Sequence, residues 1–408
     1  MRIALIAAGV ALACTGSAVA QDKPWLEVTP ALGKISGQPK GLLSKDALQE
    51  LVDVGGELFD ARFTTLDGAG RPRATQAIIP TKSGNRAVAG FARTSGPDSN
   101  GCASCHNDPV SGGAGDFVTN VFVGEGFSQF DFDSTDPQFS NERGTNHLFG
   151  AGLIELLARE MTQDLQELRA GAVRTARQTG QDARIALETK GVNFGWITAK
   201  PQGFVLLDEL DGIDTDLVIR PFSQKGVMTS LRQFTINAMN HHHGMQAQER
   251  FGRRWTDEPD FDEDGHADEL SEGDIAALVA WQATLPAPVR DTRDNAEWQK
   301  AAEAGEKLFE DIGCGGCHMQ ALPLRSLAFA DPGPFDSAGT LNDRQVAGAS
   351  VYDLALLDWA KGLPRNHKGE VLVPLFGDLK RHNMTDGDVD ALGNELLSQR
   401  FVDRTIFA

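Results

Sequence analysis

Two short strings of cysteine and histidine carry the most specific chemistry in this chain. Each has the pattern C-x-x-C-H, in which two thiols can add to the vinyl groups of one haem while the adjacent histidine faces the iron. The residues are Cys102, Cys105, His106, Cys314, Cys317 and His318. A thioredoxin-like motif, half of a zinc site or a disulfide could explain one cysteine pair. Two copies, each followed by histidine, favour two covalently bound haem c groups.

A second group of possible ligands has the pattern D-x-D-x-D-G. Its carboxylates are Asp260, Asp262, Asp264 and Asp268. Carboxylates at alternate positions can converge on one cation, and Gly265 permits the sharp turn, so the loop predicts Ca²⁺. An EF-hand has a bidentate glutamate at the twelfth position, where this chain has Ser271, so Glu269 or Glu272 would have to compensate. The alternative is a solvated acidic turn.

Whether the sixth coordination position of each iron is filled would distinguish an electron carrier from an enzyme, because an iron with an open position can bind a substrate. For the second haem we favour Met384 and then His382, since both follow the second motif at an expected loop-to-helix entry. For the first, the run 241–243 holds three histidines that would point about 100° apart on a helix, so only one can face an iron. We take this to be His243, with His147 as a competitor. A solvated polar loop is the alternative for the run.

Peroxide chemistry at an open iron would also need an acid–base group on the substrate side. Glu155 is the first candidate, because the glycines of the segment 150–155 bring backbone close to a neighbouring surface. His147 is the second. An ordinary helix carboxylate is the alternative for Glu155.

The elements around the motifs suggest two similar units. Each motif follows an expected helix that ends in Gly-x-x-Leu-Phe, at 55–59 and at 305–309, and the two motifs are too far apart to share one cytochrome c-like unit. Apolar spacing and turn residues predict helices over 45–59, 151–178, 229–239, 271–285 and 297–309, with short strands at 194–197, 204–207 and 217–220.

The N-terminus has the features of a secretory signal peptide. A charged residue, the apolar run 3–13 and the cleavage pattern Ala18-Val19-Ala20 predict that residues 1–20 are removed. Lipid attachment at Cys14 is the weaker alternative. We therefore expect a periplasmic protein, with an N-terminal domain at 21–290 and a C-terminal domain at 291–408.

Charge and hydropathy limit the kinds of partner that the chain is expected to bind. The formal net charge of −19 excludes the basic surface that nucleic acids require, and it suits docking to a basic redox protein. No apolar run after the leader reaches the length of a membrane span.

Taken together, these features resemble the bacterial di-haem c-type oxidoreductases described as peroxidases or thiol oxidoreductases. That family is distantly related to di-haem cytochrome c peroxidases and to MauG. The similarity covers most of residues 45–400. Besides the haem motifs, it rests on the segments 148–155, 231–234, 260–270 and 378–384. Members continue beyond the equivalent of Phe407, so the second domain is expected to be truncated.

The resemblance implies a mainly α fold of two cytochrome c-like domains, the first with a large α+β insertion. It implies a peroxidase-like reaction, in which a small cytochrome c or cupredoxin passes electrons through the haem on His318 to an oxidant such as hydrogen peroxide at the haem on His106. Relatives have a tryptophan between the haems, and Trp255 and Trp281 are the options here. A pure electron-transfer cytochrome and a haem oxygenase-type enzyme acting on an organic substrate remain as alternatives. Thiol exchange is disfavoured, because no mature cysteine lies outside the haem motifs.

Overall fold

The computed structural model describes residues 32–70, 80–82, 100–116, 118–122, 140–223, 226–289, 294–332 and 349–382, with the backbone alone for 118–122 and 140–143. The predicted signal peptide at 1–20, Cys14 within it, and Met384 lie outside the described residues.

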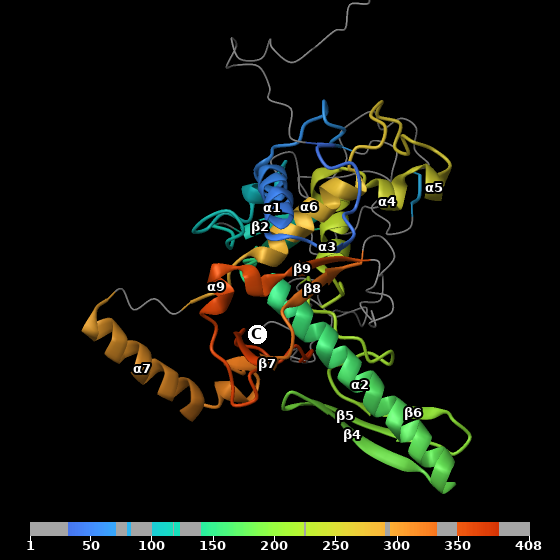
Figure 1. Cartoon of the computed structure of the whole chain (residues 1–408), viewed down its shortest axis with the longest axis vertical. Helices are drawn as coiled ribbons and strands as arrows, with labels where there is room; N and C mark the ends of the chain where they lie inside the picture. Colours follow the sequence, from blue (N-terminus) through green and yellow to red (C-terminus); the bar gives the residue numbers. More distant parts are fainter. Residues whose placement is uncertain are drawn as a thin grey trace, which may run out of the picture.

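A pair of tightly packed helices forms the centre of the molecule (Figure 1). Helix α1 (Lys45–Asp60) begins at the N-cap Ser44, and helix α6 (Glu272–Thr284) begins with a capping box at Ser271. Nearly every residue of α6 is buried, and its alanines allow α1 to approach closely. At the crossing, a Cβ on Gly55 would lie 2.0 Å from the carbonyl oxygen of Ala277, so only glycine fits. The predicted helices at 45–59 and 271–285 are confirmed.

A long helix and a small sheet form an arm that extends from this centre (Figure 1). Helix α2 (Ala151–Thr179) lies between two glycines of left-handed conformation, Gly150 and Gly180. The antiparallel strands β4 (Ala183–Thr189), β5 (Val192–Ala199) and β6 (Val205–Leu210) pack against it. The predicted helix and two of the predicted strands are therefore confirmed, whereas residues 217–220 form no strand.

Strands also shape the C-terminal part of the chain. Strand β9 (Ser350–Asp353) pairs with β8 (Ala328–Asp331) and, in parallel, with β1 (Gly41–Leu42) from the N-terminal part. Strands β7 (Ala321–Leu324) and β10 (Val371–Pro374) form a second sheet. The ranges predicted as separate domains thus share one sheet.

A buried network of charged groups holds that sheet against the N-terminal part. The guanidinium of Arg232 contacts Glu249 at 3.0 Å and Asp331 at 2.9 Å, and all three side chains are almost completely buried. The hydroxyl of Tyr352 donates to the same Asp331 oxygen at 3.1 Å. Charged side chains can be buried in this way only because each is paired with a group of opposite charge.

The expectation of a mainly α fold is wrong: the chain has a mixed α/β fold. The described residues form two three-stranded and two two-stranded sheets. The resemblance implied helical cytochrome c-like domains, and the expected strands were confined to 194–220, so the strands of the C-terminal part were not predicted. There, short runs such as Ala321–Leu324 alternate between more and less buried positions, and a strand satisfies that pattern.

The remaining elements are shorter or more exposed. Helix α7 (Ala296–Asp311), predicted at 297–309, has no buried residue and lies apart from the centre (Figure 1). The others are α3 (Leu231–Ala238), the π-helix η3 (Met239–His243), α4 (Gln248–Phe251), α5 (Arg253–Thr256), α9 (Asp358–Lys361), the 3-10 turns η2 (Cys102–Ser104), η4 (Cys314–Gly316) and η6 (Leu354–Leu356), and strands β2 (Val118–Phe122) and β3 (Ser140–Gly144). Among the described helices, none has the length and hydropathy needed to cross a membrane.

Candidate haem and cation sites

The first C-x-x-C-H motif folds as a tight turn against the end of α1. Residues Cys102–Ser104 form η2, and the amide of His106 donates to the carbonyl oxygen of Cys102 at 2.9 Å. A Cβ on Gly101 would lie 2.2 Å from the carbonyl oxygen of Ala61, so a glycine is required where the turn meets the helix end. None of the four described cysteines forms a disulfide.

The histidine of this motif is suited to act as a metal ligand. Burial lowers the pKa of His106 to about 4, because desolvation disfavours the charged imidazolium. The ring is therefore neutral at pH 7, and a metal ligand must be neutral. Its Nδ1 is buried and has no hydrogen-bond partner in the described part of the chain. The ring of Phe59 lies 6.2 Å away, between centroids.

One histidine of the 241–243 run lies beside this motif. The π-helix η3 continues α3 and turns His243 inward, where the side chain is 3% exposed. Its Nε2 lies 3.7 Å from Sγ of Cys102. The neighbours His241 and His242 are only partly buried. Single-turn π-helices are frequent at functional sites, because the extra residue redirects a side chain.

The second motif has the same construction. Residues Cys314–Gly316 form η4, and the amide of His318 donates to the carbonyl oxygen of Cys314 at 2.9 Å. Nδ1 of His318 lies 3.0 Å from the carbonyl oxygen of Phe376, which accepts its proton if that tautomer is present. This contact leaves Nε2 for a metal and fixes the ring, as the second shell of a metal ligand commonly does. Cys317 is exposed, whereas both cysteines of the first motif are only partly exposed.

The repeated Gly-x-x-Leu-Phe elements place equivalent phenylalanines against the two histidines. Phe59 ends near His106, and Phe309 lies 5.9 Å from the ring of His318. The repeat was visible in the sequence, although the contact was not. No sequence signal pointed to Phe376, which packs edge-on against Phe309 and lies 58 positions from His318.

Two further candidate residues, His382 and His147, differ in their surroundings. Nε2 of His382 is held 2.8 Å from Oδ2 of Asp378, so that nitrogen is already engaged. His147 is exposed and stacks on Phe149, next to a segment that hydrogen-bonds to the first motif's loop through Leu148 and Gly112.

Glu155 is 1% exposed, and both of its oxygens are occupied. Oε1 accepts from Arg159 at 2.7 Å, and Oε2 accepts from the amide of Leu231 at 2.7 Å. Glu155 thus anchors the first turn of α3, and it is buried and paired with Arg159 rather than exposed to a substrate. The predicted acid–base role does not fit these contacts.

Of the two tryptophans considered, Trp281 lies closer to the first motif. Its ring stacks on Phe59 at 4.1 Å between centroids, and Phe59 in turn lies next to His106. Trp255 is on the short helix α5 and is 51% exposed.

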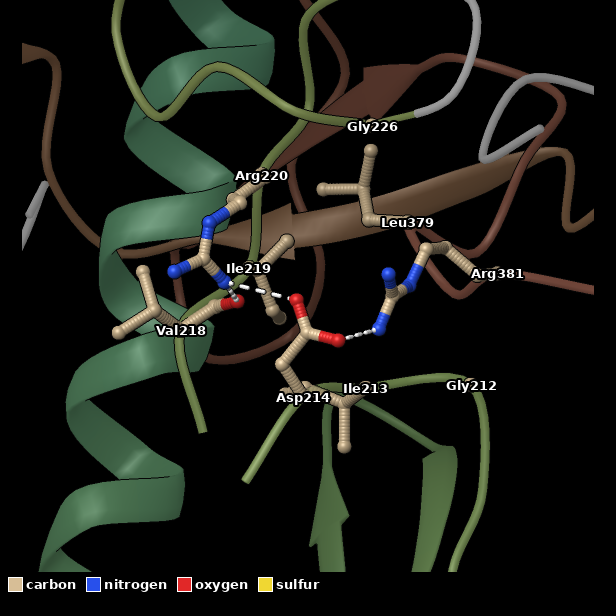
Figure 2. Close-up of a pocket in the computed structure, with 9 residues that line it drawn as sticks. All are labelled: Gly212, Ile213, Asp214, Val218, Ile219, Arg220, Gly226, Leu379 and Arg381. Carbon is tan, nitrogen blue, oxygen red and sulfur yellow. Dashed lines mark hydrogen bonds and ion pairs between the residues drawn. The ribbon is translucent and has the colours of Figure 1, made fainter. Parts of the chain in front are cut away.

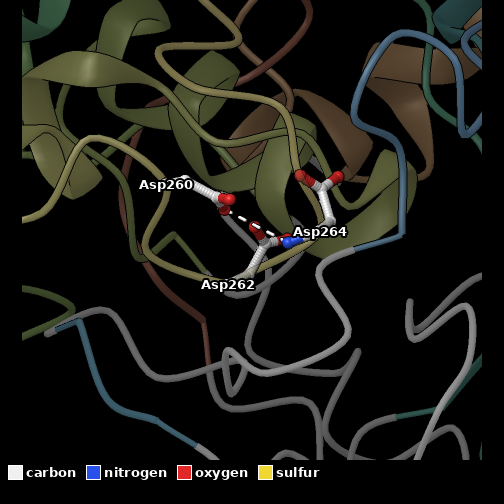
Figure 3. A group of neighbouring side chains, drawn as sticks. All are labelled: Asp260, Asp262 and Asp264. Carbon is white, nitrogen blue, oxygen red and sulfur yellow. Dashed lines mark hydrogen bonds between the residues drawn. The ribbon is translucent and has the colours of Figure 1, made fainter.

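The acidic loop brings three aspartates together (Figure 3). Ligand oxygens of Asp260, Asp262 and Asp264 all lie within 4.8 Å of one another. Asp262 is fully buried, and no hydrogen-bond donor among the described residues reaches either of its oxygens. Burial, and then the neighbouring Asp264 and Asp260, raise its pKa to about 8. Asp268 is exposed and does not belong to the group.

A small pocket at the base of the arm is filled by its own ion pairs (Figure 2). Asp214 lies between Arg220, at 3.2 Å, and Arg381, so each of these charges already has a partner. The pocket connects the arm to the segment after β10 and offers no unpaired group that would select a ligand.

Comparisons of the chain with protein-family models, with curated proteins and with solved structures give no match. The functional argument therefore depends on the motifs and on their geometry.

Proposed function

We propose that the protein is an exported di-haem c-type oxidoreductase with a peroxidase-like reaction. The observation that carries the proposal is the common construction of the two motifs. In each, a C-x-x-C pair lies on a 3-10 turn, and a phenylalanine from the Gly-x-x-Leu-Phe end of the preceding helix packs near the motif's histidine. A zinc or disulfide function of one pair would not require the same surroundings twice.

The residues of each motif have defined roles in this proposal. Cys102, Cys105 and His106 would hold one haem, and the second would be held by Cys314, Cys317 and His318. Bound haem would supply electron transfer and peroxide reduction. The protein keeps His106 neutral by burial and orients His318 through a backbone carbonyl.

The overall reaction would reduce one hydrogen peroxide to two waters. It consumes two electrons and two protons, and a small cytochrome c or cupredoxin would supply the electrons. The more exposed second motif is the better entry point, and the acidic surface favours a donor with a basic docking face.

His243 favours a second candidate function, a pure electron-transfer cytochrome. Its position beside Cys102 would allow it to fill the sixth position of the first haem, and a filled position conducts electrons without admitting peroxide. Off the iron, the same imidazole could carry protons for peroxide reduction, since Glu155 is buried and paired with Arg159.

The first experiment tests haem attachment. Protein matured in a haem-attaching periplasm is denatured, and covalent haem is counted as the pyridine haemochrome. We expect two haems per chain, and one after either Cys102→Ala/Cys105→Ala or Cys314→Ala/Cys317→Ala. Ser104→Ala is the matched control on the same turn and should keep two. Absence of covalent haem in the wild-type protein would overturn the proposal.

The second experiment separates the two functions. One high-spin and one low-spin ferric haem in the electron paramagnetic resonance spectrum, with turnover of peroxide by reduced protein, would support the peroxidase-like reaction. Two low-spin haems that persist on half-reduction, without peroxide turnover, would establish the carrier instead.

A further inference from the structure

A fourth carboxylate, Glu269, lies at the end of the acidic loop, outside the group of three aspartates but close enough for their charges to act on it. Glu269 follows the exposed Asp268 but is itself only 9% exposed. Burial raises its pKa well above the usual value, and the charges of Asp262, Asp264 and Asp260 add to that effect. Gly68, at φ 97°, makes room for it, because a Cβ there would lie 2.6 Å from Cγ of Glu269.

One carboxylate of the loop lacks a compensating donor, whereas Asp260 accepts from the amides of Asp264 and Gly265, and Asp264 accepts from the amide of His266. Asp262 is completely buried, points into the group and has no hydrogen-bond partner on either oxygen in the described part of the chain. The nearby Lys82 is bound to Glu258 and Glu263, which lie outside the group. Burying a charge without a partner is costly, and a divalent cation with oxygen ligands would remove that cost.

Glu269 also connects the loop to the segment that follows His243. Its Oε2 accepts from the amide of Gln246 at 2.7 Å. The amide of Leu270 donates to the carbonyl oxygen of Gln246 at 3.2 Å, and the amide of Gln248 donates to that of Leu270 at 2.9 Å. Gln246 lies only three positions after His243, so the position of one constrains the other.

We propose that Asp260, Asp262 and Asp264 bind a calcium-type divalent cation, that Glu269 rather than Asp268 supplies the fourth carboxylate, and that the bound cation fixes the 243–247 segment and with it His243. The assignment of the cation site depends only on the contacts of this loop. The effect of the cation on a haem ligand rests on the proposed function.

The site is tested with calcium chloride and the full-length protein after removal of divalent ions with EDTA. Titration calorimetry compares the wild type with Glu269→Gln and with Asp268→Asn. Both variants replace a carboxyl group with an amide at adjacent positions. Gln retains an oxygen for the Gln246 amide, and Asn tolerates the left-handed conformation of residue 268, at φ 54°.

We expect saturable binding of one Ca²⁺ to the wild type. Glu269→Gln should weaken it about 10- to 100-fold, the usual effect of removing a supporting group from a metal site. Asp268→Asn should change it less than about threefold, as expected for an exposed charge that acts only at long range. Absence of binding in the wild type, or equal weakening in both variants, would overturn the assignment.

The link to His243 is tested by amide hydrogen exchange of the same protein with and without Ca²⁺. We expect added protection in peptides covering residues 239–248 as well as in the loop, and unchanged exchange in β4–β6. Protection confined to 258–272 would refute the link. Neither measurement uses haem absorbance, so failure of haem attachment would leave these results interpretable.

Discussion

Replacing Asp262 with asparagine should stabilise the cation-free protein at neutral pH and remove its response to Ca²⁺. The carboxyl of Asp262 has a pKa of 3.8 in its ordinary state and about 8 in the folded protein, chiefly because it is buried. The folded state therefore holds its proton more tightly than the unfolded state does, and stability falls as the pH rises from about 4 to about 8. At 1.36 kcal/mol per pH unit, the penalty reaches about 4 kcal/mol at pH 7.

Asparagine is neutral throughout this range. Its buried amide would itself lack partners, which costs about 1–3 kcal/mol. The net gain expected for Asp262→Asn in EDTA is thus about 1–3 kcal/mol at pH 7, and there should be no gain at pH 4. With calcium chloride the wild type should gain stability by mass action, whereas the variant should not.

Urea unfolding of each protein at pH 4 and pH 7, in EDTA and in Ca²⁺, measures the free energy of unfolding under all four conditions. Asp268→Asn is the control, because it removes a charge from the same loop at an exposed position. A variant that is less stable than the wild type in EDTA at pH 7 would refute the reasoning, since Asp262 would then have a compensating partner in the cation-free state.

Three further changes test other parts of the structure. Arg232→Met leaves Glu249 and Asp331 buried without their cation, so urea unfolding should show a loss of about 3–5 kcal/mol; a loss below 1 kcal/mol would mean that the ion pairs are not buried in solution. Glu155→Gln should lower stability by about 1–3 kcal/mol in thermal unfolding while peroxide turnover stays within about twofold, and a selective loss of turnover would restore the acid–base role. His243→Ala should convert a low-spin first haem to high spin if this imidazole occupies the iron, and an unchanged spectrum would exclude it as a ligand.

The sequence predicted local elements better than it predicted their assembly. Helices such as α1 and α6 were predictable because their caps and apolar spacing are contained in one short segment. The parallel pairing of β1 with β9 was not, since Gly41 and Ser350 are far apart in the chain and two residues carry no periodicity. For the same reason the sequence showed both C-x-x-C-H motifs but could not show that the carbonyl of Phe376 contacts His318.

In the acidic loop, too, the sequence pattern could not predict contacts with other segments. The acidic pattern correctly grouped three aspartates but also included Asp268, because spacing alone cannot show that residue 268 has a left-handed backbone and an exposed side chain. The carboxylate beside it, Glu269, is turned inward and held by the Gln246 amide. An EF-hand pattern has a fixed order of ligands, and here a contact with another segment decides which acidic residue approaches the loop.

The position of His243 depends on the same contacts. On a regular helix, three consecutive histidines would differ only in the direction in which each side chain points about the helix axis. The sequence alone gives no basis for choosing which of them faces the first motif. The π-helix at Met239–His243 buries His243, and the chain after it is held by Gly70 through Gly244 and by Glu269 through Gln246. Because these contacts come from the loop after α1 and from the acidic loop, a change in either loop can alter the distance between His243 and Cys102. Any redox function of the first motif would then depend on the charge state of a site built from different residues.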